Sequence, residues 1–132
     1  YRLAQLKAGG LVTDGSVRDT AELKDYGFPV FAYSSTAKQG PAVMQPWGVN
    51  DVISCGGVVV RPGDVIVGDD DGVVVVPSTM CERVLEIAVE REKIEQVIKK
   101  ELRKNPGSPG KYYPFNQNTQ KLFEDYKSRG EA

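Results

Sequence analysis

The spacing of apolar positions divides the first quarter of the chain into a strand, a short helix and a second strand. Residues 11–13 form a short apolar run, which the Asp-Gly turn signal at residues 14–15 follows. A helix is predicted over residues 20–26, because Gly27 stands in the usual position after a helix C-terminus. The next strand is predicted over residues 28–33. Together these elements predict a small β-α-β unit.

Short runs of β-branched residues dominate the middle of the chain, after a predicted loop at residues 34–50. The runs cover residues 52–60, 65–68 and 72–77. They are too short for helices and too apolar for exposed sheet edges, so they predict strands in a covered core. Three aspartates at residues 69–71 lack the spacing of a calcium-binding loop, which favours a solvated hairpin turn over a calcium site.

Helical patterns are predicted towards both ends of the chain. Residues 1–8 resemble the last turns of a helix, with the glycines at residues 9–10 as its C-terminal cap. A long helix is predicted to start at the capping-box spacing of Thr79 and Glu82 and to end before the Pro- and Gly-rich residues 105–110.

The tail beyond this breaker carries five aromatic residues between positions 112 and 126. That much aromatic surface requires burial, and on a domain this small a neighbouring subunit offers the place for it. We therefore expect residues 105–132 to form an extended arm that serves oligomerisation.

The absence of histidine excludes several classes of chemistry. Ser-His-Asp and Cys-His catalysis, histidine-ligated zinc and phosphohistidine transfer all need an imidazole. Cys55 and Cys81 lie far apart and form no C-x-x-C pattern, so neither a disulfide framework nor a thiolate metal site is indicated. Acid-base work then falls to carboxylates, lysines, tyrosines or metal-bound water, and oxygen ligands suit a hard cation such as Mg²⁺.

Charge and hydropathy narrow the partners that we expect. With 17 basic and 18 acidic residues the formal net charge is -1, which provides no large positive field for binding nucleic acid. No apolar run approaches the roughly 20 residues that a membrane-spanning helix needs, and no signal peptide opens the sequence. We expect a cytoplasmic protein with neither a nucleic acid nor a membrane as partner.

The candidate chemistry is concentrated in the stretch Arg18-Asp19-Thr20-Ala21-Glu22. A guanidinium can clamp a carboxylate substrate with two hydrogen bonds, and a neighbouring carboxylate can hold a divalent metal. Two structural alternatives remain open. Asp19 and Glu22 have the spacing of a capping box, and Arg18 could form a salt bridge with Asp14.

Three segments carry a family resemblance. They are Gly-Leu-Val-Thr-Asp-Gly-Ser-Val-Arg-Asp-x-x-Glu, Phe-Pro-Val-Phe-Ala and Cys-Gly-Gly-Val-x-Val-x-Pro-Gly-Asp, in that order. Together they resemble the family that contains the regulator of ribonuclease E activity A and the class II 4-hydroxy-4-methyl-2-oxoglutarate/4-carboxy-4-hydroxy-2-oxoadipate aldolases. The resemblance extends over about residues 4–104.

The resemblance implies an α/β fold of the swivelling β/β/α type, assembled as a trimer or hexamer with sites between subunits. It also implies a lyase that uses Mg²⁺ or Mn²⁺ to cleave a 2-oxo acid through a pyruvate enolate, as an aldolase, an oxaloacetate decarboxylase or both. In this sequence the catalytic residues would be Arg18 and Asp19. Arg18 would bind the substrate, while Asp19 and Glu22 would be the metal-associated acids.

The sequence departs from the family pattern at its beginning. The leading glycine of the motif and the family's glycine-rich loop would precede Tyr1. We therefore expect residues 1–104 to be the C-terminal portion of such a domain and the isolated chain to have little activity. The missing part would lie on a companion chain of a cleaved or split polypeptide, or would have been removed by truncation. The alternative function is that of a non-catalytic, protein-binding regulator of the ribonuclease E inhibitor type.

Overall fold

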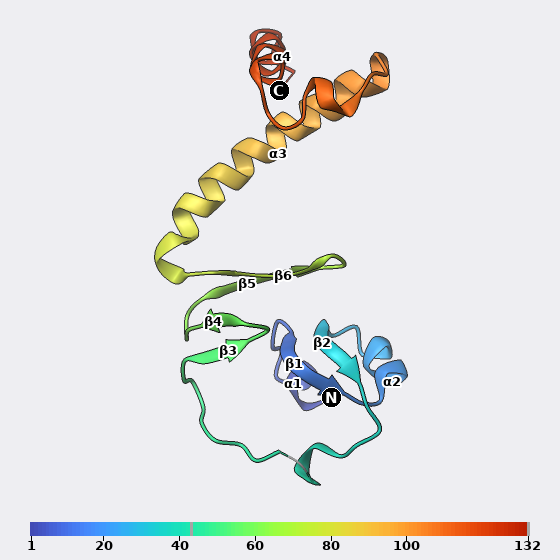
Figure 1. Ribbon diagram of the computed structural model, residues 1–132, viewed down its shortest axis with the longest axis vertical. Coiled ribbons are helices and arrows are strands. Elements are labelled where there is room, and N and C mark those ends of the chain that lie inside the picture. Colours follow the sequence, from blue (N-terminus) through green and yellow to red (C-terminus); the bar gives the residue numbers. More distant parts are fainter. Residues whose placement is uncertain (43, 132) are drawn as a thin grey trace. The chain divides into compact units, whose positions relative to one another are not determined.

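A computed structural model describes residues 1–42 and 44–131. The chain forms two compact units, Tyr1–Thr79 and Met80–Ala132, and each is described here by itself (Figure 1). The long helix belongs to the second of these units. The expected division at residues 104–105, between part of an RraA-like domain and an arm, stays a prediction.

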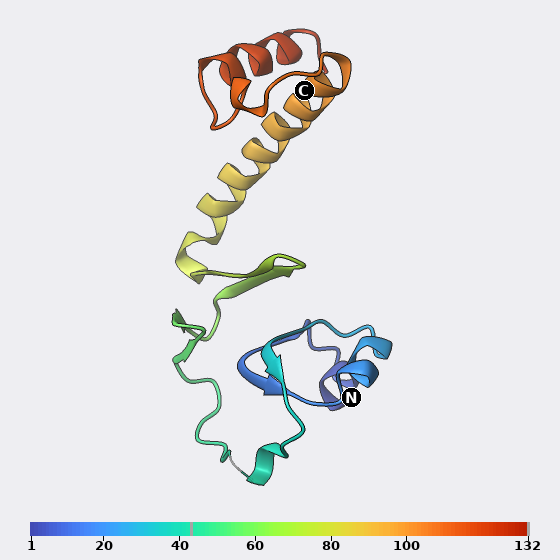
Figure 2. The same cartoon turned by 45° about the vertical axis from the view of Figure 1, so that its right-hand side comes forward.

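The first unit begins with a β-α-β arrangement. After the short helix α1 (Arg2–Gln5) come strand β1 (Leu11–Val17), helix α2 (Thr20–Asp25) and strand β2 (Val30–Ser35). Strands β1 and β2 pair in parallel (Figure 2), so the two strands end at the same edge. Gly27 ends the crossover with a φ of +59°, as expected for a residue that follows a helix.

The predicted turn at residues 14–15 is wrong. β1 continues through both residues, and the register shifts between Thr13 and Ser16 as in a β-bulge. The Gly15 N–H donates to Thr13 Oγ1 at 3.0 Å, which satisfies this donor where the ladder is interrupted. The first helix also ends earlier than expected, at Gln5, and Lys7 with a φ of +55° reverses the chain before the glycines.

Two antiparallel hairpins follow the loop. Strands β3 (Ile53–Cys55) and β4 (Val58–Val60) turn at Gly56 and Gly57, which both have positive φ. Strands β5 (Val65–Asp69) and β6 (Gly72–Val76) form the second hairpin. At its turn Asp69 Oδ1 accepts hydrogen bonds from the N–H groups of Asp71 and Gly72, and all three aspartates are exposed, as a solvated turn requires.

The expected covered core is absent from the described part of the first unit. β5 is exposed along its whole length, and none of the described residues from 1 to 79 is fully buried. Val67 is 56% exposed and Val74 is 62% exposed. The Val-rich strands thus carry the apolar sequence of buried strands without a cover inside this unit.

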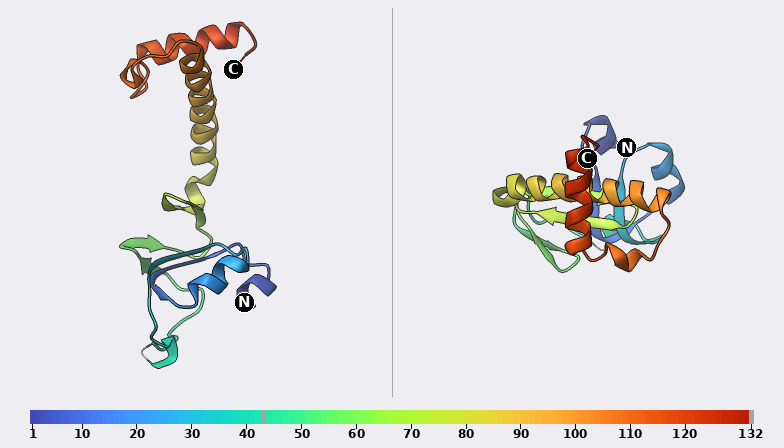
Figure 3. Two further views of the ribbon diagram at one scale, coloured as in Figure 1. Left: turned by 90° about the vertical axis from the view of Figure 1, so that its right-hand side faces the viewer. Right: turned by 90° about the horizontal axis from the view of Figure 1, so that it is seen from above.

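The second unit contains two helices that pack against each other. Helix α4 (Gln117–Ser128) crosses the long helix α3 (Cys81–Lys104) near the C-terminal end of α3 (Figure 3). Their contact buries Val97, Phe123 and Tyr126, with Ile94 and Leu122 at its margin. Within the described ranges, neither α3 nor any other helix has the length and apolar character needed to cross a membrane.

Helix α4 stands in place of the extended arm that the sequence predicts. Asn116 caps the helix by accepting from the N–H groups of Asn118 and Thr119, and the Thr119 side chain completes a capping box. The Thr119 hydroxyl also donates to the carbonyl of Tyr112 at 2.6 Å. Tyr112, Phe123 and Tyr126 are therefore buried within their own chain, whereas Tyr113 is 42% exposed, and the role of the tail in oligomerisation stays a prediction.

The entry to α3 also differs from the prediction. Residues Ser78–Met80 form a 3-10 turn, and the N-cap is Met80, which makes no side-chain cap hydrogen bond. The Ser78 N–H instead donates to Asp64 Oδ1 at 3.2 Å. The C-terminal end of α3 at Lys104 agrees with the predicted breaker, because Asn105 follows as the C-cap.

Replacing Phe123 by alanine should destabilise the second unit. The ring is only 7% exposed, so its removal is expected to lower the free energy of unfolding by about 3–5 kcal/mol. Chemical denaturation followed by helical circular dichroism measures this change. Lys121→Ala, at an exposed position of α4, is the control and should change the value by no more than about 0.5 kcal/mol. Equal effects of both substitutions would contradict the packing described.

Candidate functional site

A hollow lies at the edge where the parallel strands β1 and β2 end. It has a volume of about 450 Å³, and its lining comes from the residues that follow each strand. These residues are Arg18, Asp19, Thr20, Ser35, Thr36 and Ala37. In open α/β sheets, ligands bind beyond the carboxyl ends of parallel strands, which makes this hollow a candidate binding site.

Backbone and side-chain contacts hold the two sides of the hollow together. The Thr36 N–H donates to the Val17 carbonyl at 2.9 Å, which extends the pairing past the end of β2. At the preceding pair of the β1–β2 register, the hydroxyls of Ser16 and Ser34 are 2.7 Å apart and share a hydrogen bond. The segments that carry Arg18 and Thr36 are therefore fixed beside each other by the strand register.

Asp19 takes an uncommon backbone conformation at the mouth of the hollow. Its φ of 58° and ψ of 39° lie in the left-handed region, which costs non-glycine residues about 1–2 kcal/mol and which aspartate tolerates better than most. Its carbonyl accepts the first hydrogen bond of α2, from the Leu23 N–H at 3.0 Å. The left-handed turn therefore connects β1 directly to α2 without a loop.

Arg18 and Asp19 form an exposed ion pair. Arg18 Nε donates to Asp19 Oδ2 at 3.2 Å, and the two side chains are 48% and 59% exposed. Exposed pairs of this kind contribute about 1 kcal/mol or less, since water solvates both partners. The guanidinium can therefore leave Asp19 for a ligand carboxylate at small cost, and it can then make two hydrogen bonds to that carboxylate.

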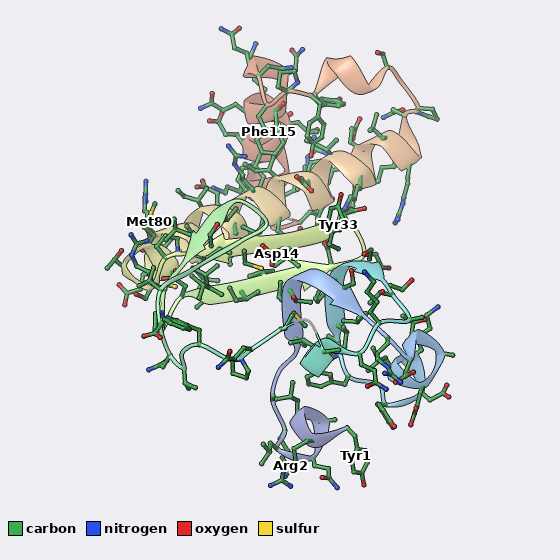
Figure 4. All side chains as sticks on the ribbon, turned by 60° about the horizontal axis from the view of Figure 1, so that its bottom comes forward. Tyr1, Arg2, Asp14, Tyr33, Met80 and Phe115 are labelled. Atoms are coloured by element: carbon green, nitrogen blue, oxygen red, sulfur yellow. The ribbon has the colours of Figure 1, made fainter. Side chains whose placement is uncertain are left out.

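The structural alternatives for these residues are not realised. Asp19 occupies the N-cap position of α2 but makes no side-chain cap hydrogen bond. Asp14, the alternative partner of Arg18, lies on β1 (Figure 4), and its Oδ2 accepts from the Gly56 N–H at 3.0 Å. Asp14 therefore links β1 to the β3–β4 turn, and the ion pair of Arg18 is with Asp19.

Glu22 lies outside the lining of the hollow. Its Oε1 accepts a short hydrogen bond from the Tyr26 hydroxyl, one helical turn further along the chain. This hydrogen bond raises the pKa of Tyr26, because the phenol proton is held by the carboxylate. The structure thus brings Arg18 and Asp19 together but directs Glu22 to Tyr26, and the metal-binding role of Glu22 stays a prediction.

The hollow offers one carboxylate, that of Asp19, to a Mg²⁺ or Mn²⁺ ion. Mg²⁺ keeps several waters and is often held by one or two carboxylates together with its substrate, and the exposed Asp19 carboxylate is such a ligand. In residues 1–42 and 44–131, no group of three or more cysteine and acidic side chains is close enough to form a metal site. Asp19 is thus the residue of this hollow that could hold such an ion.

Ser35 and Thr36 line the hollow but are not among the site residues that the sequence predicts. The first lies at the end of β2 and the second directly after it, whereas the sequence pattern predicts a loop for both. A signal was available, because the polar run that begins at Ser34 follows the second strand of a β-α-β unit. In that position polar residues face the same edge as the residues that follow the first strand.

The chain is similar in sequence and in fold to known proteins. The family model for RraA-like proteins, described as Aldolase/RraA, matches residues 2–75. A Halalkalibacterium halodurans protein named "Putative 4-hydroxy-4-methyl-2-oxoglutarate aldolase" is 41% identical over 90 residues, which are 66% of this chain and 41% of that protein. A Deinococcus radiodurans protein of the same name is 36% identical over 64 residues, which are 48% of this chain and 39% of that protein.

A solved structure gives the same relationship. It is Streptomyces coelicolor RraAS2, described as an unusual member of the RNase ES inhibitor RraA protein family. It superposes with a TM-score of 0.66 and 30% identity, over 76% of this chain and 52% of the other. The chain therefore spans about half of the length of these relatives or less. The expected α/β fold is confirmed, and because the family model matches more than half of its residues, the chain belongs to the RraA-like (Aldolase/RraA) family.

Proposed function

We propose that this chain carries the arginine and aspartate of a divalent-metal-dependent lyase, which cleaves a C–C bond of a 2-oxo acid and releases pyruvate. The observation that carries the proposal is the Arg18–Asp19 pair at the carboxyl edge of β1, within the hollow that Ser35 and Thr36 also line. The aldolase names of two relatives support this class of reaction.

Arg18 is the substrate-binding residue in this proposal. A 2-oxo acid presents a carboxylate next to a carbonyl group, and a planar guanidinium matches the carboxylate with two parallel hydrogen bonds. The half-exposed guanidinium of Arg18 can turn from Asp19 to the substrate without losing a buried partner. The hydroxyls of Ser35 and Thr36 line the same hollow and offer further hydrogen bonds to the bound acid.

The reaction places negative charge where Arg18 can neutralise it. When the bond between C3 and C4 breaks, its electron pair moves into the 2-oxo group, and pyruvate enolate forms in both aldol cleavage and oxaloacetate decarboxylation. A guanidinium that its hydrogen bonds to the neighbouring carboxylate hold beside this oxygen stabilises the transition state more than the ground state. A Mg²⁺ or Mn²⁺ ion held by Asp19 would supply Lewis-acid polarisation of the same oxygen when bound. Glu22 stays a proposed second acid for that ion.

A second candidate is a protein-binding regulator that keeps the fold without the reaction. It is supported by the description of the Streptomyces coelicolor relative as belonging to an RNase inhibitor family. The two candidates differ in what the Arg18 hollow must do, since a regulator needs no affinity for a 2-oxo acid. For either candidate, assembly into a trimer or hexamer remains part of the proposal.

Arg18→Ala should weaken binding of oxalate, a stable analogue of pyruvate enolate. Loss of a charge-assisted, two-point contact is expected to weaken the affinity by about tenfold or more. Titration of the ¹⁵N-labelled chain, followed by amide chemical shifts, measures it. Arg61→Ala is the matched control, because Arg61 lies outside the lining of the hollow and should leave the affinity within about twofold. Unchanged binding by Arg18→Ala would overturn the site.

Mg²⁺ should increase the affinity for oxalate through Asp19. In Asp19→Asn this gain is expected to fall to less than about a third of its wild-type size, since an amide oxygen is a weaker ligand than a carboxylate. Isothermal titration with and without EDTA measures the gain. Asp25→Asn removes an acid of α2 outside the hollow and should retain it. An equal gain in all three proteins would contradict metal binding at Asp19.

The isolated chain should release little pyruvate from oxaloacetate. The chain spans 41% of the length of the Halalkalibacterium relative, so part of the site is expected to come from elsewhere. A coupled pyruvate assay, corrected for the protein-free Mg²⁺ rate, measures the release. Rapid, EDTA-sensitive release by residues 1–132 alone would show that the site is complete within this chain.

A further inference from the structure

A second and larger hollow lies within the first unit. It has a volume of about 990 Å³, and all three strand pairs contribute to its lining. Its walls are mainly apolar and include Val12, Phe31, Ile53, Val58, Ile66 and Val73. We call it the apolar hollow to distinguish it from the Arg18 hollow.

The walls of the apolar hollow are held together by specific contacts. A Cβ built on Gly68 of β5 would come within 2.6 Å of the Phe31 ring of β2, so this glycine allows the two strands to approach closely. The hydrogen bond from the Gly56 N–H to Asp14 links β1 to the β3–β4 hairpin. The hollow is therefore formed by neighbouring strands in contact with one another.

In the part of the chain that the structure describes, the strands around the apolar hollow have exposed apolar side chains and open edges with unpaired backbone groups, and both can bind another polypeptide segment. Each strand pairs with one neighbour among the described residues, so each of the three sheets has two strands and two open edges. Ile53 is 54% exposed, Val58 49% and Ile66 42%. Two-stranded sheets with an exposed apolar face are at best marginally stable in water, and open edges accept further strands.

We propose that the apolar hollow is the docking surface for the polypeptide segment that carries the remainder of an RraA-like domain. The relatives supply the argument for this occupant, since the chain spans 41% of one and 52% of another, and about as much polypeptide again lies outside the match. An occupant of that origin brings the apolar strands that these edges can pair with. The inference goes beyond the proposed reaction, because it holds for a lyase and for a regulator alike.

Val58 and Val59 provide a matched pair for testing this surface. They are neighbours on β4, have the same side chain and are each 49% exposed. Val58 lines the apolar hollow, whereas Val59 does not and lies opposite Ser54 in the register. Because both positions are half exposed, Val58→Lys and Val59→Lys should cost the isolated chain similar and small amounts of stability. Circular dichroism checks this equality.

The probe is the longest contiguous part of the Halalkalibacterium halodurans relative outside its 90 matched residues. Carrying an affinity tag, it is co-expressed with the wild-type chain or a variant, and the amount of chain retained on the resin is measured. The wild-type chain and Val59→Lys should be retained equally. Val58→Lys should be retained at least about tenfold less, because a lysine would be buried in an apolar contact.

Three results would overturn the proposal. They are failure of the probe to retain the wild-type chain, equal retention of the two lysine variants, and formation of a dimer by the wild-type chain alone that Val58→Lys abolishes. The last result would assign the apolar hollow to a second copy of this chain. None of them bears on oxalate binding, so this test and that of the proposed reaction fail separately.

Discussion

The parallel pairing of β1 with β2 is the constraint on which the candidate site depends. A parallel pair needs a crossover, and α2 supplies it between Val17 and Val30. Because both strands run the same way, Arg18 and Asp19 at the end of one strand meet Ser35 and Thr36 at the end of the other. The left-handed backbone of Asp19 allows the helix to start at once, which keeps this residue at the edge.

Much of this arrangement could be predicted from local sequence. Gly27 marked the end of α2, the β-branched runs marked β5 and β6, and Asn105 followed the end of α3 as expected. Local sequence signals gave the wrong structure where pairing with a neighbouring strand determines the backbone path. The Asp-Gly pair at residues 14–15 is a turn signal, but Ser16 and Val17 pair with β2, so the chain passes through it as a bulge.

The tail shows a different limit of local sequence. Helical spacing relates Thr119, Leu122, Phe123 and Tyr126, and Asn116 is a capping residue, but neither signal decides whether the aromatic side chains are buried on α3 or on another subunit. Burial on α3 satisfies the same demand within the chain. Likewise, Arg18 and Asp19 could be predicted from their residue types, whereas the separation of Glu22 depends on the position of Tyr26 one turn away.

The two units differ in how much of their own apolar surface they bury. The second unit closes a small core around Val97, Phe123 and Tyr126, and its buried Thr119 is hydrogen-bonded on both sides. The first unit leaves its valines half exposed, yet it carries the candidate site. β1 belongs to both hollows, since Val12 lines one and Arg18 follows the strand into the other. The backbone of β1 therefore connects the apolar surface that the first unit leaves open to the edge at which Arg18 lies.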